Sequence, residues 1–86
     1  MEKEIYQTSD INIAATLLSL GVDILGINPA DPSRVLFYFD ESNGRVANFV
    51  NSYWQGDLRV DPKSLINCRR DLLSRVKESE RNLKGY

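Results

Sequence analysis

Apolar residues recur at intervals of three and four positions in three stretches of the chain, and this spacing predicts three amphipathic helices. We expect them over residues 10–20, between residues 43 and 56, and from residue 62 to near the C-terminus. The apolar positions that define them are, in chain order, Ile13, Ala14, Leu17, Leu18 and Leu20; Val46, Phe49, Val50 and Tyr53; and Leu65, Ile66, Leu72, Leu73, Val76 and Leu83.

Residues at the expected helix ends support these boundaries. Gly21 lies where a left-handed backbone conformation would end the first helix, and Gly56 is expected to end the second. Asp61 followed by Pro62 is a strong helix start, because a carboxylate can cap free N–H groups and proline suits the first helical position. Further capping candidates are Thr8, Ser9 and Asp10 for the first helix, and Ser42 and Asn43 for the second.

Two other stretches predict strands that pair as an antiparallel hairpin. Residues 34–40 are β-branched and aromatic and are apolar on both faces, as in a central strand. Residues 22–28 are the expected partner, and the proline-containing residues 28–33 are the expected turn. Residues 4–8 suit either an edge strand or an extended arm. The predicted fold class is α+β: a small antiparallel sheet, with or without this third strand, packed by three helices in the order β-α-β-β-α-α.

The composition is that of one globular domain. The chain has 86 residues, of which 42% are hydrophobic and 27% charged. We expect residues 1–86 to form a single domain with a frayed helix end over residues 77–86. No segment has the roughly 18 apolar residues of a membrane span, and no hydrophobic signal region follows residues 1–4. The expectation is a cytoplasmic protein without membrane contact.

The chain lacks histidine and has one cysteine. It therefore has no imidazole for acid–base catalysis and no thiol pair for a zinc site, and its glycines match no phosphate-binding motif. We expect no enzyme activity, no cofactor and no metal site. Asp40 and Glu41 follow the central strand, where some nucleases hold Mg²⁺, but the usual Glu-x-Lys companion is missing. Helix capping or strand termination is the favoured interpretation of these carboxylates.

The net charge of −1 conceals a division along the chain. Residues 1–60 carry four basic and eight acidic residues, whereas residues 61–86 carry seven basic and four acidic residues. Five cations of the last helix fall within about 60° of one another at 100° per residue, and they form a candidate polyanion-binding face. These cations are Lys63, Arg70, Lys77, Arg81 and Lys84. An ordinary solvated face is the alternative, because Asp71 and Glu78 occupy the neighbouring flank.

Tyr53 and Trp54 are the candidate partner-binding residues. Adjacent residues on a helix point about 100° apart, so Tyr53 fits the apolar stripe and Trp54 lies at its margin. Tryptophan and tyrosine are common anchors at protein interfaces, and aromatic rings also stack on bases. The alternative is that Trp54 packs over the last helix and closes the core.

Cys68 and Arg69 lie beside the apolar arc of the last helix. Cys68 is expected to be a buried, unreactive thiol, although the neighbouring cations could activate it. The stem of Arg69 is expected to lie along the apolar surface, with its head group reaching water or an acidic partner.

Packing and turn residues occur in a characteristic combination: Tyr6-x-Thr8-Ser9-Asp10, Ala14-Ala15 with Leu17-Leu18, Leu20-Gly21, Phe37-Tyr38-Phe39, and Tyr53-Trp54-x-Gly56-x-Leu58-x-Val60-Asp61-Pro62. Together they resemble a family of small uncharacterised proteins of bacteria and their phages, which is labelled as a domain of unknown function. The resemblance spans nearly the whole chain. It implies a fold and a phage or mobile-element setting, and it brings no catalytic residues.

These observations support two functional hypotheses. The first is a non-enzymatic interaction protein, such as a phage or mobile-element accessory factor that occupies a surface of a host or viral protein. The second is a nucleic-acid-binding module that uses the basic face of the last helix. Self-association is compatible with either, because so small a sheet has edges that can pair and the acidic front of one copy could meet the basic tail of another in a homodimer.

Overall fold

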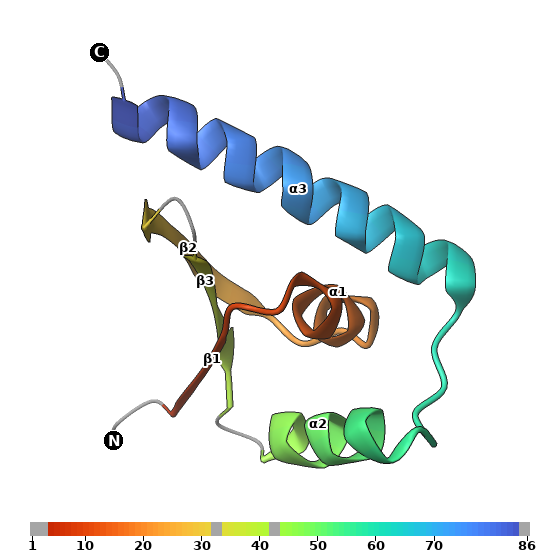
Figure 1. Ribbon diagram of the computed structural model, residues 1–86. Helices are drawn as coiled ribbons and strands as arrows, with labels where there is room; N and C mark the ends of the chain where they lie inside the picture. The colour runs from red at the N-terminus through yellow and green to blue at the C-terminus, as the bar shows by residue number, and fades with distance from the viewer. Residues whose placement is uncertain (1–3, 32–33, 42–43, 85–86) are drawn as a thin grey trace.

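The computed structural model describes residues 4–31, 34–41 and 44–84, and of residues 30, 31 and 80–84 it describes the backbone alone. Its elements, in chain order, are β1 (Ile5–Thr8), α1 (Ile11–Ser19), β2 (Ile24–Asp31), β3 (Arg34–Asp40), α2 (Arg45–Gln55) and α3 (Pro62–Lys84). This is the predicted order, and the predicted α+β class is confirmed (Figure 1).

The three strands form one antiparallel sheet in the order β1-β3-β2. The aromatic strand β3 is central, as predicted from its apolar character on both faces. The N-terminal segment is a strand that pairs with β3, with Tyr6 opposite Phe39 and Thr8 opposite Phe37. Ile24 of β2 lies opposite Phe39 on the other side. The inner face of the sheet is therefore built around Phe37 and Phe39.

β2 begins later and extends further than predicted. Residues 28–31, expected to belong to the turn, continue the strand through Pro29 to Asp31, which lies opposite Arg34. Proline has no N–H to donate to a neighbouring strand, but β2 is an edge strand, where this loss is tolerated. The pairing with β3 also shifts register between Asn28 and Asp31, which accommodates the irregular segment.

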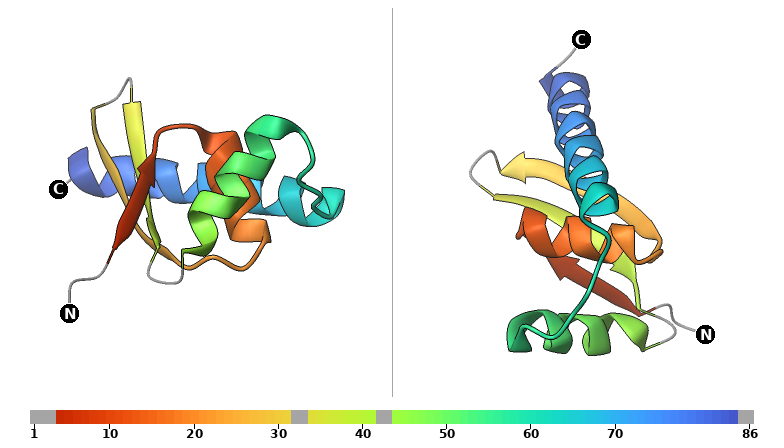
Figure 2. Two further views of the ribbon diagram at one scale, coloured as in Figure 1. Left: turned by 90° about the horizontal axis from the view of Figure 1, so that it is seen from below. Right: turned by 90° about the vertical axis from the view of Figure 1, so that its right-hand side faces the viewer.

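α1 lies at the centre of the molecule. In Figure 1 the sheet lies on one side of α1, α3 crosses above it and α2 lies below it, and the two further views agree (Figure 2). Residues 13–17 are all buried, and five successive residues cover more than one helical turn. The one-sided apolar stripe predicted for this helix is therefore too narrow, because α3, α2 and β1 all pack against it.

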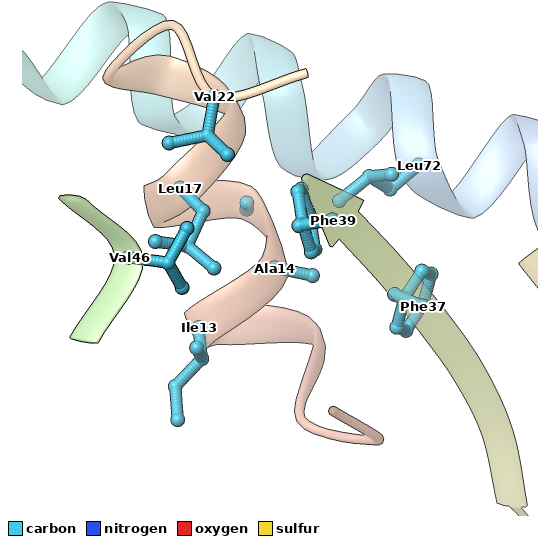
Figure 3. Packing of buried hydrophobic residues seen from close by; sticks show 9 residues of the cluster. Ile13, Ala14, Leu17, Val22, Phe37, Phe39, Val46 and Leu72 are labelled. Atoms are coloured by element: carbon cyan, nitrogen blue, oxygen red, sulfur yellow. The ribbon is translucent and has the colours of Figure 1, made fainter. Parts of the chain in front are cut away.

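The core lies where α1, α2, α3 and β3 meet. Phe39 of β3 is fully buried between Ala14 of α1 and Leu72 of α3 (Figure 3). Val46 extends the cluster from α2. Burying a side chain of the size of leucine or phenylalanine contributes about 1.5–3 kcal/mol. The buried hydrophobic residues are Ile13, Ala14, Ala15, Leu17, Val22, Phe37, Phe39, Val46 and Leu72.

Carboxylates near each helix start accept hydrogen bonds from backbone N–H groups. Asp10 accepts from Asn12 (2.8 Å) and Ile13 (3.3 Å), Glu41 from Val46 (3.1 Å), and Asp61 from Ser64 (2.9 Å). The N-cap position of α2 is Gly44, which has no side chain for this role, so Glu41 supplies the acceptor from outside the helix. The predicted caps Ser42 and Asn43 lie outside the described residues.

Candidate functional site

Trp54 is the most exposed large hydrophobic residue among those the structure describes. Its exposed fraction is 68%, whereas Tyr53, its neighbour on α2, packs against the core. Val46 faces the core at the start of the same helix, and residues 49, 50 and 53 continue that face. The side chain of Trp54 points about 100° away from that of Tyr53, so it lies outside the side of α2 that faces the core. The alternative in which Trp54 closes the core is therefore wrong.

An apolar pocket of about 260 Å³ lies beside Tyr53. It is bounded by α1, the end of α2, the connection between α2 and α3, and the first turns of α3. The residues that line it are Thr16, Tyr53, Gly56, Leu58, Val60 and Leu65. The hydroxyl of Thr16 donates to the carbonyl of Asn12 at 2.7 Å, so this polar group is already satisfied within α1. The pocket therefore offers a mainly apolar surface to an occupant.

The rings of Tyr53 and Trp54 meet edge to face, with centroids 5.2 Å apart and planes at 88°. Tyr53 thus connects the pocket with the exposed indole of Trp54. Gly56 ends α2 directly afterwards with φ of +82°, and the backbone then turns toward α3. We call Tyr53, Trp54 and the adjoining pocket the aromatic site.

Two pocket residues, Leu58 and Val60, were not predicted as functional. They lie in the connection between α2 and α3, in a segment that the sequence identified only as a short extended link. The sequence feature that could have identified them is their alternation with Asp57 and Arg59, which are exposed. Extended backbone points successive side chains to opposite sides, so alternate apolar residues share one side.

The candidate polyanion-binding face is present in part. Lys63, Arg70 and Lys77 are exposed, and their spacing of seven residues places them along one line of α3. None of the three forms an ion pair with another residue that the structure describes. The side chains of Arg81 and Lys84 lie outside the described part of the chain, although α3 continues through both residues.

Ile66 and Leu73 differ from the prediction for α3. They were expected to widen its buried arc, but their exposed fractions are 56% and 40%. The core side of α3 is narrower, because a single line of contact against α1 and β2 buries Leu72 while the adjacent residue, Leu73, stays in solvent. The two aliphatic side chains lie next to the line of cations.

The carboxylates considered for metal binding have structural contacts. Glu41 caps α2, and Asp40 lines a hollow of about 40 Å³ together with Asp23 and Arg45. Such a volume has room for water rather than for a substrate. Across residues 4–31, 34–41 and 44–84, no group of three or more cysteine, aspartate or glutamate side chains is placed to hold a metal ion.

Cys68 and Arg69 bridge the core and the surface of α3. Cys68 is partly buried and packs against the hydrophobic core, so it is less enclosed than predicted. Arg69 is exposed to solvent, which agrees with the first of its two expected environments, and its Nε–H donates to Oδ1 of Asn12 at 3.2 Å rather than to an acidic side chain. This hydrogen bond ties α3 to the start of α1.

The geometry thus defines a small α+β domain with two exposed surfaces, an aromatic one on α2 and a basic one on α3. The chain belongs to the DUF5659 family, a domain of unknown function, whose match covers residues 3–85. This confirms the resemblance to an uncharacterised family. Neither a curated protein nor a solved structure matches the chain. Among the described residues, no helix combines the length and apolar character needed to cross a membrane.

Proposed function

We propose that this protein is a non-enzymatic binding module of the cytoplasm that attaches to another protein through the aromatic site. The observation that carries the proposal is the exposed indole of Trp54 beside an apolar pocket of about 260 Å³. Tryptophan and tyrosine contribute more binding energy at protein interfaces than most residues do, because they bury a large area with few rotatable bonds.

The dimensions of the pocket favour a side chain of a partner over a free ligand. Small-molecule sites commonly enclose about 300–1,000 Å³, and this pocket is smaller and mainly apolar. An aliphatic or aromatic side chain of the partner would enter it beside Tyr53, and the partner backbone would cover Trp54. In the phage or mobile-element setting that the resemblance implies, such a module would act by covering a surface of a host or viral protein.

Affinity purification from the native organism tests this proposal when it is paired with a point variant. The wild-type protein should retain a partner, and Trp54→Ala should lower the recovered amount by at least about tenfold, the loss typical of an interface anchor. Gln55→Ala is the matched control, since residue 55 is exposed on the same helix. A partner retained equally by the Trp54→Ala variant would contradict the proposal.

A nucleic-acid-binding module is the second candidate function, and the aligned cations Lys63, Arg70 and Lys77 favour it. Neutralising phosphates releases counterions, so affinity for DNA should fall steeply with added salt. Arg70→Glu should weaken retention on DNA or heparin at low salt and reduce its dependence on salt. Arg75→Glu is the control with the same charge change, because Arg75 pairs with Asp71 at 3.0 Å on another side of α3. No DNA binding at low salt would exclude this candidate.

A further inference from the structure

α3 presents an apolar line to solvent that the aromatic site does not use. Ile66 and Leu73 are 56% and 40% exposed and lie one heptad apart, so their side chains follow the helix axis about 10.5 Å apart. The side chain of Leu72, which points about 100° away from that of Leu73, holds α3 against α1 and the sheet. The exposed line therefore lies on a helix that the core keeps in place.

We propose that this face of α3 binds an amphipathic helix of a partner protein, with acidic residues flanking its apolar seam. The apolar seam of a coiled coil uses two positions of each heptad, and a spacing of seven residues is the repeat of one of these positions. Ile66 and Leu73 supply this repeat on α3, and no described helix covers them.

The charged residues beside the apolar line determine which charge the partner helix should carry. Lys63, Arg70 and Lys77 repeat at the same spacing of seven and run parallel to Ile66 and Leu73. In coiled coils, charged residues that flank the seam select the partner helix by complementary charge. A row of cations therefore selects glutamate or aspartate at the flanking positions of the partner. Pairing with α3 of a second copy would bring two such rows together and is disfavoured by repulsion.

The exposed aliphatic side chains also favour an acidic helix over two other anionic partners, a nucleic acid and a bilayer surface. Phosphates gain nothing from contact with the exposed aliphatic side chains of Ile66 and Leu73. A bilayer surface needs a broad apolar face with bulky anchors, whereas these two residues form a single line. The combination fits the narrow seam of a helix pair.

Binding of designed helical peptides to the full-length protein tests the proposal. The probe is a peptide of about three heptads with leucine at the a and d positions and glutamate at the e and g positions, and the control peptide carries lysine in place of glutamate. Fluorescence anisotropy should show the acidic peptide binding at least about tenfold more tightly than the basic one. The pair of substitutions Arg70→Glu and Lys77→Glu should reverse this preference.

A second pair of variants tests the apolar line. The double variant Ile66→Ser with Leu73→Ser should bind the acidic peptide at least about tenfold more weakly. Asn67→Ser, at an exposed position of α3, should leave this affinity unchanged. Circular dichroism checks that each variant keeps its helix content. Trp54→Ala should leave peptide binding unchanged, so the proposal for α3 and the proposal for the aromatic site are tested independently.

Three outcomes would overturn the proposal. The acidic peptide could show no measurable binding, or it could bind no better than the basic one. In the third outcome, duplex DNA or vesicles with anionic lipid bind the wild type and lose binding on charge reversal, while the serine variants bind them as well as the wild type does. That result would assign the cations to phosphate instead.

Discussion

Tyr53 and Trp54 are adjacent on α2, and their rings meet edge to face with centroids 5.2 Å apart. Tyr53 nevertheless packs against the core, whereas Trp54 is 68% exposed. The 100° rotation between successive helical residues separates their environments. Tyr53 anchors the pair in the fold, and Trp54 presents an apolar surface whose burial requires a partner. This separation allows the stability of the domain and its binding to be measured with different variants.

Trp54→Ala should change the free energy of unfolding by less than about 0.5 kcal/mol, because the indole is largely in solvent. Tyr53→Ala, which removes a ring packed on the core, should lower it by about 1–3 kcal/mol. Urea denaturation measures both values. Trp54 is the only tryptophan, so its fluorescence should be open to acrylamide quenching, and a blue-shifted, protected emission would contradict the exposure.

Leu72 and Leu73 are a matched pair of leucines with opposite environments. Leu72 is fully buried against Phe39, and its replacement by alanine should cost about 2–5 kcal/mol through lost contacts and a cavity. Leu73 is 40% exposed, and the same change there should cost less than about 1 kcal/mol. Equal losses of unfolding free energy for the two variants, measured by thermal or urea unfolding, would contradict an α3 that buries Leu72 and exposes Leu73.

Glu41→Ala should lower the free energy of unfolding by about 0.5–2 kcal/mol, because the N–H of Val46 loses its side-chain acceptor. Glu4→Ala is the control: it removes the same charge from an exposed side chain. Comparison of the two variants by urea denaturation separates the cap from the change in net charge. A loss no larger than that of the control would argue against the hydrogen bond.

Gly56→Ala should destabilise the domain by about 1–2 kcal/mol, because a left-handed backbone conformation is strained for residues with a Cβ atom. A Cβ there would meet no atom within 4 Å, so the cost arises from the backbone alone. Gly26→Ala is the contrast: its φ is not positive and its Cβ would make an ordinary 3.9 Å contact with Tyr38. That variant should be neutral or slightly stabilised, and differential scanning calorimetry can rank the two.

Much of the fold could be predicted because its signals are local. The apolar spacing identified all three helices, and the aromatic run of β3 identified the central strand. Asp61 and Pro62 marked the start of α3, and the carboxylate of Asp61 does accept the N–H of Ser64. These features depend on backbone geometry and on residues a few positions apart, which is why one sequence suffices to find them.

The candidate site was less predictable, because its properties depend on which elements meet. Periodicity placed Trp54 at the margin of a stripe, and only the packing of α2 decided that it faces solvent. The same limit applies to Ile66 and Leu73, which have the spacing of buried residues but lie outside the contact between α3 and α1. The pocket combines residues from α1, α2, α3 and a connecting segment that are distant along the chain.

The amino-acid sequence by itself determined the order of the elements, the type of each except the N-terminal segment, and most of their ends. The tertiary structure alone decided that the N-terminal strand pairs with β3, that residues 13–17 of α1 are all buried, and which apolar residues remain exposed. The physical reason is that hydrogen bonding and backbone preference act between near neighbours, whereas burial depends on the area that distant segments remove from water.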